Sequence, residues 1–443
     1  MKKDRRLSRR QFLGNAAAAA APMIVPASVF GRPGRPAPGD RITMGLIGCG
    51  GQGRSDMGGF IGLPDVQVVA VCDVDSGHME AAQKSVNDHY AKKNDKDYKG
   101  CAAIKDFREL AGRKDIDAVI IGTPDHWHFL TAYEAVKNKK DVYGEKPITH
   151  TYPEAKFLVQ AVKEHKVIWQ TGSQQRSEFS FRRGAEVVRN GLLGKVKEVE
   201  VGLPQGRSGH KKGAEKVEDP PANVDYDMWC GPAPKLPFMK SRFHFDWRWN
   251  LAFGGGQLLD WICHHNDIAH WGLDEDLGGP LEVEAVDWAW PEDKTVFDAP
   301  YQYKVVQKYA KDIKVSICSD NFVHHGVKWI GENGWIMSNR GNRIDTSNPE
   351  WAKPEFDPGP VKLYVSPGHQ KNFIESVKSR KPAICPIEVS HHSITPGHLG
   401  YLAEKLKRKI KWDPKEEKVI GDDEAMKVLN TLEYRAPWKF PPA

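Results

Sequence analysis

A glycine-rich turn in this sequence has the spacing of a dinucleotide-binding loop. Gly48, Gly50 and Gly53 form a G-x-G-x-x-G pattern between an apolar segment at 42–47 and a helix-compatible segment. The first glycine permits a tight turn, the second lets the backbone approach a pyrophosphate, and the third allows close helix–strand packing. Free N–H groups at the helix N-terminus then bind the phosphate charge. The residues expected to bind the dinucleotide are Gly48, Gly50, Gly51, Gln52 and Gly53.

An acidic residue at the end of the next apolar segment favours NAD over NADP. Asp73 lies 20 residues after Gly53 and directly follows the segment 66–72. A carboxylate there accepts hydrogen bonds from the adenosine ribose and repels a 2′-phosphate. Arg54, at the start of the helix, leaves NADP as an alternative.

A third apolar segment, 117–121, is followed by Gly122-Thr123-Pro124-Asp125-His126-Trp127-His128. Ligands of open parallel sheets lie outside the carboxyl ends of the strands. We therefore expect Thr123 and Pro124 to line the nicotinamide channel and His128 to contact cofactor or substrate. Helix capping and packing are the alternatives for His126 and His128.

Further motifs, in the same order along the chain, resemble those of the Gfo/Idh/MocA oxidoreductases. They are Gly144-Glu145-Lys146-Pro147 and the longer run from Gly254-Gly255-Gly256-Gln257 through Asp260 to His264. The C-terminal stretch 411–438, which ends in Tyr434-Arg435-Ala436-Pro437-Trp438, resembles the exported branch of this family. The resemblance covers about residues 42–438 and implies an oxidoreductase that forms homo-oligomers.

The resemblance assigns catalysis to Lys146, Asp260 and His264, and Glu145 and Lys146 are both expected to contact the cofactor. Asp260 and His264 are spaced i, i+4 and therefore share one face of a helix. A carboxylate beside an imidazole fixes its tautomer and raises its basicity. Either Lys146 or His264 would take the hydroxyl proton as hydride leaves carbon. A polar core pair that caps the glycine loop is the structural alternative for Asp260 and His264.

Three residues are weaker candidates for substrate contacts. Arg176 follows the last apolar segment of the N-terminal half, where a structural salt bridge is the alternative. Trp249 belongs to the aromatic stretch 242–250, whose rings suit the C–H face of a sugar, and packing is the alternative. His398, with His391 and His392, lies on a late helix that could return to the site.

The histidine and cysteine spacing predicts no metal site. His264, His265 and His270 lie near Asp267, but adjacent histidines point to different helix faces, and H-E-x-x-H and paired-cysteine motifs are absent from the sequence. The seven scattered cysteines are expected to be buried and unpaired.

The elements that must position these residues divide the chain into two predicted domains. Strands alternate with helices over 41–172, which predicts a doubly wound parallel Rossmann sheet in an α/β class protein. Later strands occur with few helices between them, so 173–443 is predicted to be an α+β domain with a mostly antiparallel open sheet, for substrate binding and oligomerisation. The expected strands are 42–47, 66–72, 117–121, 141–143, 167–170, 196–203, 281–289, 301–309, 313–319, 328–331 and 334–338, and the main expected helices are 76–92, 131–139, 153–165, 181–190, 369–379, 390–408 and 423–432.

Residues 1–31 are predicted to be a twin-arginine export signal. Ser8-Arg9-Arg10-Gln11-Phe12-Leu13 precedes an alanine-rich apolar run, and a Pro/Gly linker follows at 32–40. An amphipathic helix is the alternative. The protein is thus expected to be periplasmic or otherwise exported, and twin-arginine transport would let a folded chain carry its cofactor along.

The composition argues against nucleic-acid binding and membrane insertion. The net charge of the 443 residues is +6, and residues 1–31 hold six Lys/Arg against one Asp, so the remainder is close to neutral. Beyond the signal, the sequence contains no apolar run of roughly 18 residues that could span a membrane. The expected partner is a small sugar or polyol.

Three functions are compatible with these residues. The first is hydride transfer between a retained NAD(P) and a secondary alcohol of a sugar, polyol or sugar derivative. The second is a redox-neutral, NAD-dependent glycosidase or lyase, in which transient oxidation acidifies a neighbouring C–H before elimination. The third is a non-catalytic sugar-binding protein, against which the joint presence of Lys146, Asp260 and His264 argues.

Overall fold

The computed structural model describes residues 38–93, 98 and 100–442. The predicted signal peptide and most of the predicted linker lie outside these residues. Among the described helices, none is both long and apolar enough to cross a membrane. All seven cysteines fall within the described ranges, where each is buried and unpaired, as predicted.

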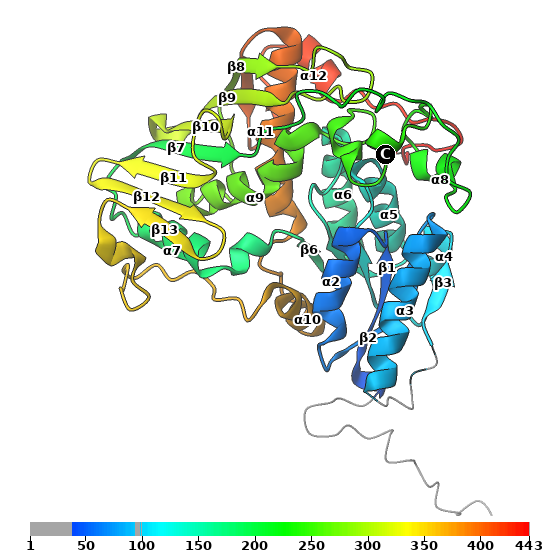
Figure 1. The fold of residues 1–443 in the computed structure, drawn as a ribbon. Helices are drawn as coiled ribbons and strands as arrows, with labels where there is room; N and C mark the ends of the chain where they lie inside the picture. Colours follow the sequence, from blue (N-terminus) through cyan, green and yellow to red (C-terminus); the bar gives the residue numbers. More distant parts are fainter. Residues whose placement is uncertain (1–37, 94–97, 99, 443) are drawn as a thin grey trace, which may run out of the picture. The chain divides into compact units, whose positions relative to one another are not determined.

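The first sheet has six parallel strands and confirms the predicted Rossmann fold (Figure 1). Its strand order is β3-β2-β1-β4-β5-β6, so the order reverses between β1 and β4, where ligands bind in such sheets. The strands are β1 (Ile42–Ile47), β2 (Val66–Cys72), β3 (Ala102–Ile104), β4 (Ala118–Ile121), β5 (Asp141–Gly144) and β6 (Trp169–Thr171). The helices between them are α2 (Gly51–Ile61), α3 (Ser76–Lys92), α4 (Phe107–Gly112), α5 (Asp125–Lys137) and α6 (Tyr152–His165).

Two local features of this sheet differ from the prediction. β3 and α4 were not predicted. β3 has only three residues, none of them fully buried, and α4 has only six. Helix α5 begins at Asp125 rather than near residue 131. The preceding Pro124 is extended, with φ −62° and ψ 156°, and the polar run that follows it forms the first helical turn.

The second sheet has nine strands in the order β13-β12-β11-β7-β10-β9-β8-β14-β15. β7 and β10 run parallel, whereas the other described pairs are antiparallel, which confirms the predicted mostly antiparallel sheet. The strands are β7 (Val196–Leu203), β8 (Glu282–Ala289), β9 (Gln302–Lys308), β10 (Lys314–Ser319), β11 (Gly326–Gly331), β12 (Gly334–Asn339), β13 (Arg343–Thr346), β14 (Ile410–Asp413) and β15 (Lys418–Val419).

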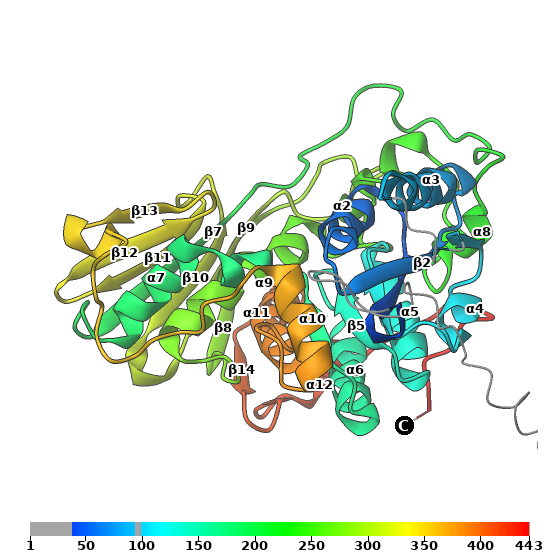
Figure 2. The ribbon, with the colours of Figure 1, turned by 90° about the horizontal axis from the view of Figure 1, so that it is seen from below.

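Three helices, α7 (Phe179–Arg189), α9 (Gly256–Leu273) and α11 (Ile387–Leu406), pack on this sheet (Figure 2). Helix α9 is the central one, because it contacts β7, β11, α7 and α11 and is buried along nearly all of its length. It is therefore a rigid support for Asp260 and His264. The remaining elements are α8 (Tyr226–Cys230), α10 (His369–Ser379), α12 (Asp423–Leu429) and the short 3-10 helices η2 (Pro38–Asp40), η3 (Gln174–Ser177), η4 (Lys240–Arg242), η5 (Asp246–Trp249), η6 (Ala310–Asp312) and η7 (Pro349–Ala352).

The C-terminal segment, residues 434–440, returns to the Rossmann sheet. The ring of Trp438 lies 4.8 Å from that of Trp127 and 6.4 Å from that of Phe107, measured between centroids. Phe440 stacks on Phe129, with centroids 5.2 Å apart. Residues from opposite ends of the fold thus share one apolar cluster.

Candidate active site

A cavity of about 530 Å³ opens at the switch point of the Rossmann sheet. Its walls come from the glycine loop, from the ends of β2 and β4, from the start of α5, and from the segment 228–248 of the second half of the chain. The lining residues that the sequence predicted are Gly48, Gly50, Gly51, Gln52, Asp73, Thr123, Pro124, His128, Glu145 and Lys146. The lining side chains that it did not single out include His78, Lys105, Phe107, Trp127, Met228 and Trp229, whereas His244, Phe245, Trp247 and Arg248 come from the aromatic stretch 242–250.

The glycine loop has the shape that a dinucleotide requires. A Cβ atom on Gly53 would lie 2.0 Å from the carbonyl oxygen of Gly48, so this glycine allows close helix–strand packing. Gly48 has φ +90°, a backbone conformation that favours glycine. Gly50 and Gly51 line the cavity, and a Cβ on either would meet no described atom within 4 Å. The space beside them is thus left for a ligand, and the loop fits a bound pyrophosphate.

Asp73 is held rigidly at the end of the cavity nearest β2. Its carboxylate accepts hydrogen bonds from the backbone N–H of Cys49 at 2.6 Å and of Asp75 at 2.8 Å. Burial raises the pKa of Asp73, while these two backbone donors lower it. Lys105 lies at the same cavity and directly follows β3. Because β3 was not predicted, the sequence offered no signal that Lys105 stands at a strand end.

Lys146 lines the cavity and meets Asp260, although the two come from different halves of the chain; Asp260 and His264 are not among the residues that line the cavity. The Lys146 Nζ atom donates to Asp260 Oδ1 at 3.0 Å and to the backbone carbonyl of Asp260 at 2.7 Å. Arg248 Nε also donates to Asp260 Oδ1, at 3.2 Å. Burial opposes ionisation of Asp260, but the charges of Lys146 and Arg248 more than offset it, and the pKa is lowered. The Lys146 ammonium is therefore fixed by an ionised carboxylate.

The structure separates His264 from the predicted carboxylate partner. Among the described residues, Asp260 bonds to Lys146 and Arg248 and not to His264. The expected orientation of His264 by Asp260 is thus wrong: the i, i+4 spacing gives a shared helix face but does not determine which neighbour each side chain meets. His264 is buried, and its Nδ1 atom has no hydrogen-bond partner within the described ranges. Burial, together with the charges of Lys146 and Arg340, holds the pKa of His264 well below its usual value.

Glu145 belongs to a buried carboxyl pair behind the glycine loop. Burial and the neighbouring Glu145 raise the pKa of Asp56. Burial also raises the pKa of Glu145, although the charge of Lys146 lowers it in part. The amide of Gln52 donates to Asp56 at 3.2 Å, and that of Gln174 donates to Glu145 at 3.2 Å. Both carboxyl groups therefore have raised pKa values, with burial the first cause in each.

His128 lines the cavity and also connects two chain segments. Its Nδ1 lies 2.5 Å from the carbonyl oxygen of Pro147, and its Nε2 lies 2.8 Å from that of Thr123. Burial lowers the pKa of His128 to about 4. His126 instead faces the carbonyl oxygens of Phe253 and Trp229, away from the cavity lining. His128 therefore positions the Lys146 segment against the end of β4.

The three weaker substrate candidates lie outside the lining of the described cavity. Arg176 is buried in ion pairs with Asp267 and Asp276, each at 2.7 Å. The structure thus shows the salt bridge that was the alternative to a substrate contact. Trp249 is buried, and its Nε1 donates to Gln257 at 2.9 Å. His398 is buried on α11. Within the aromatic stretch 242–250, it is His244, Phe245, Trp247 and Arg248 that face the cavity.

Two family models together match most of the chain. Residues 42–173 match the NAD-binding Rossmann domain of the Gfo/Idh/MocA oxidoreductase family, and residues 180–440 match its C-terminal alpha/beta domain. A glycosyl hydrolase family 109 protein from Saccharopolyspora erythraea is 31% identical over 207 residues, which cover 43% of this chain and 44% of the relative. The uncharacterized oxidoreductase YrbE from Bacillus subtilis is 26% identical over 191 residues, 43% of this chain and 49% of YrbE. The chain thus spans less than half the length of these curated relatives.

Solved structures of low sequence identity share the fold. The WlbA dehydrogenase from Chromobacterium violaceum, in complex with NADH and UDP-GlcNAcA, has a TM-score of 0.62 at 17% identity and covers 88% of this chain and 99% of its own. The aldose-aldose oxidoreductase from Caulobacter crescentus, complexed with glycerol, has a TM-score of 0.60 at 16% identity, covering 85% and 99%. With its glycine loop, its strand order and both family domains, this chain belongs to the Gfo/Idh/MocA oxidoreductases and carries their NAD-binding Rossmann domain.

Proposed function

We propose that this protein transfers hydride to or from a secondary alcohol of a sugar, polyol or sugar derivative and retains its NAD(P) cofactor between turnovers. One observation carries the proposal: an ammonium group, Lys146 Nζ, is held at the dinucleotide cavity by Asp260 at 3.0 Å. When bound, NAD supplies a hydride acceptor or donor. Hydride transfer at an alcohol also requires a group that exchanges the hydroxyl proton.

Lys146 is suited to hold the reacting oxygen of the substrate. Its side chain is 12% exposed and that of Asp260 is 8% exposed, so the pair is largely screened from water, and Lys146 lines the cavity. Asp260 and Arg248 fix the ammonium through the contacts described above. His264 is a neutral imidazole near neutral pH because its pKa is lowered, and it is the alternative proton acceptor.

Aromatic walls support retention of the cofactor. Trp127, Trp229, Phe245 and Trp247 line the cavity and offer apolar ring surface to a bound dinucleotide. Retention would also suit an exported enzyme, since free NAD is expected to be scarce outside the cytoplasm. We extend the proposal to periplasmic or other twin-arginine export, to regeneration of the cofactor by a second substrate, and to a homo-oligomer.

A redox-neutral, NAD-dependent glycosidase is the second candidate function. It is favoured by the similarity to glycosyl hydrolase family 109 proteins and to the alpha-N-acetylgalactosaminidase from Shewanella oneidensis, which is 27% identical over 158 residues, 35% of this chain and 33% of that enzyme. The same Lys146 could hold the substrate oxygen during the transient oxidation.

One experiment separates these functions. The purified protein is denatured and the released dinucleotide is measured; the intact protein is then mixed with sugars, polyols and aryl glycosides. Reduction of the bound cofactor by one sugar and its reoxidation by another supports the oxidoreductase. Release of aglycone without net NADH change supports the glycosidase. Bound sugar without either reaction contradicts both and leaves a binding protein.

A further inference from the structure

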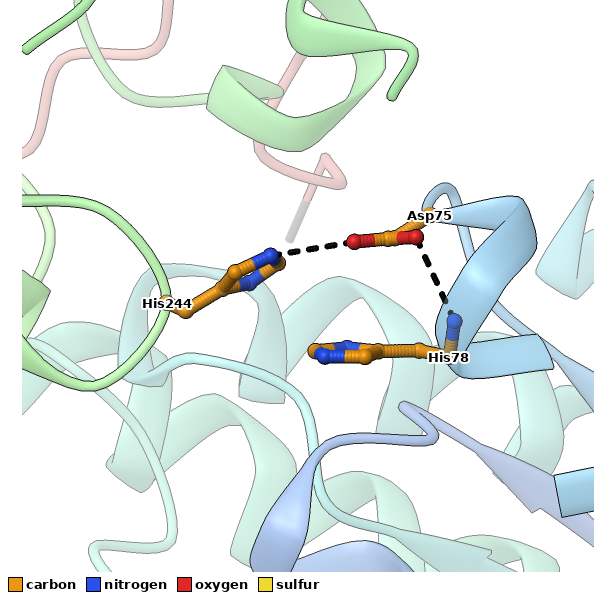
Figure 3. A group of neighbouring side chains, drawn as sticks. All are labelled: Asp75, His78 and His244. Atoms are coloured by element: carbon orange, nitrogen blue, oxygen red, sulfur yellow. Dashed lines mark hydrogen bonds and ion pairs between the residues drawn. The ribbon is translucent and has the colours of Figure 1, made fainter. Parts of the chain in front are cut away.

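Asp75, His78 and His244 place one carboxylate and two imidazoles together (Figure 3). The two histidines line the cavity. One ligand atom from each residue lies within 4.8 Å of the other two. Asp75 Oδ2 and His244 Nε2 are 3.0 Å apart, and the two imidazole centroids are 4.4 Å apart. Ligand atoms around a tetrahedral ion with bonds of about 2.0–2.1 Å are separated by roughly 3.3 Å. Small side-chain rotations would therefore bring these atoms to coordination distance.

The carboxylate of this cluster is oriented by the surrounding chain. Asp75 Oδ1 accepts hydrogen bonds from Gly77 N and from Asn223 Nδ2, both at 2.8 Å. These bonds hold one oxygen at the start of α3 and direct the other, Oδ2, towards His244 (Figure 3). Ordered partners of this kind around the ligands are characteristic of metal sites in proteins.

His244 adopts a left-handed backbone conformation at the cluster. Its φ is +56°, in the left-handed region that residues other than glycine rarely adopt. The His244 ring lies against Phe243, with centroids 3.8 Å apart, and pairs with Asp75 on its other side. Strain of this size usually persists where a side chain must reach a particular place.

We propose that Asp75, His78 and His244 bind one divalent transition-metal ion, with zinc the best match. Two imidazoles and a carboxylate are a common zinc ligand set, and three protein ligands leave a fourth position for water. The sequence gave no indication of this site, because His244 lies far from the other two ligands along the chain. The histidines considered in the sequence, His264, His265 and His270, are not part of it.

The position of the site gives the ion a function. Asp75 and His78 belong to the Rossmann half, whereas His244 belongs to the segment that carries Phe245, Trp247 and Arg248 over the cavity. An ion bound there would tie that segment to α3 and slow the release of a bound dinucleotide. This second part of the inference rests on the proposed function, whereas metal binding does not.

Metal binding is tested on purified protein treated with a chelator and then titrated calorimetrically with zinc chloride, with magnesium chloride for comparison. We expect one zinc per chain and at least tenfold weaker binding in His78→Ala, His244→Ala and Asp75→Asn. The asparagine keeps an oxygen for the helix cap, so Asp75→Asn tests the ligand without removing the cap. The partly exposed His165 at the end of α6 provides the control, and His165→Ala should bind zinc as the parent does. Absence of stoichiometric zinc, or equal zinc binding by all of these variants, overturns the site.

The tether is tested by the release rate of NADH, followed by its fluorescence after dilution with and without zinc. We expect zinc to slow release at least tenfold in the parent and to have no effect in His244→Ala. Equal rates with and without zinc overturn the tether. Binding of zinc without any dinucleotide would contradict the tether and the proposed function but leave the metal site in place. Cycling of NAD without zinc binding would contradict this inference alone.

Discussion

The Lys146–Asp260 ion pair joins the end of the Rossmann strand β5 to helix α9 under the second sheet. A buried charge that loses its partner is costly, so each member of the pair fixes the position of the other. Arg248 adds a second cation on the same carboxylate. Removal of the lysine therefore leaves Asp260 partly compensated, and a test of Lys146 can be read as chemistry rather than as unfolding.

We expect Lys146→Met to lower kcat by about 10²–10³-fold, since the ammonium that holds the reacting oxygen is lost. Affinity for NADH should change only a few-fold because the glycine loop and Asp73 remain. Turnover is measured with a sugar or polyol that reduces the bound cofactor in the experiment under Proposed function, and NADH binding by fluorescence titration. Lys156→Met, at an ion pair with Glu417 outside the cavity, is the control and should keep full activity. Parent-like turnover of Lys146→Met would remove this lysine from the mechanism.

Asp125 predicts a particular pH dependence of stability. Burial, aided by the charge of Asp260, raises its pKa to about 8, whereas in an unfolded chain the pKa is about 4. Between these values the folded state binds the extra proton, so this group makes the free energy of unfolding fall as pH rises, by at most about 1.4 kcal/mol per pH unit. Urea unfolding from pH 5 to 8 should show a flatter profile for Asp125→Asn than for the parent. The exposed Asp345 is the control, and Asp345→Asn should retain the parent slope.

The sequence predicted which residues lie at the site better than it predicted which side chains contact one another. Gly48, Asp73 and Lys146 lie at the cavity as predicted, because a fixed turn or strand end specifies where such residues stand. His264 could not be placed by the same reasoning. Its surroundings depend on Arg340, which reaches it only through the tertiary fold.

At the scale of elements, the glycines of the loop serve two different purposes: one allows close packing, and another leaves space for a ligand. Gly53 is required by packing, because its α-hydrogen faces the Gly48 carbonyl, whereas Gly50 borders empty space. The helix α2 that follows begins without a side-chain cap, so its first N–H groups remain available to a ligand.

Two alanine substitutions should therefore have different effects. Gly53→Ala would place a Cβ 2.0 Å from a backbone oxygen and should destabilise the fold by about 1–3 kcal/mol. Gly50→Ala should change stability by less than about 1 kcal/mol and weaken NADH binding at least tenfold, because its methyl group enters the ligand space. Thermal unfolding and fluorescence titration of each variant measure the two effects. Equal effects of both substitutions on stability would contradict this division.

Long elements with clear ends were predictable, whereas short ones were not. The helix predicted at 76–92 is α3, whose start is fixed by the Asp75 side chain accepting from Gly77 N and His78 N. Strand β7 likewise has its predicted bounds. β3 has only three residues, Ala102–Ile104, and this apolar run is too short to indicate a strand.

At the scale of the whole molecule, the C-terminal segment supports the cavity from behind. Phe107 and Trp127 line the cavity, and Trp438 packs on both of them. Arg435 anchors the same segment through the carbonyl oxygens of Gly231 and Ala233. One side of the dinucleotide site thus depends on residues that lie at the far end of the described chain.

We expect Trp438→Ala to lower the free energy of unfolding by about 1–3 kcal/mol, since a partly buried aromatic ring is lost. It should also weaken NADH binding several-fold, because Phe107 and Trp127 lose their support. Trp290→Ala, which removes a partly buried ring stacked on Trp288 outside the cavity, is the matched control and should affect stability alone. Undiminished NADH affinity in Trp438→Ala would show that the wall is rigid without the segment.

This packing also determines when, relative to synthesis, the dinucleotide site can be completed. A ribosome synthesises the whole parallel sheet long before Trp438 and Phe440 emerge, so Phe107, Trp127 and Phe129 lack these ring contacts until then. Capture of the dinucleotide should therefore be post-translational. Chaperones that bind apolar surfaces could bind Phe107, Trp127 and Phe129 during this interval.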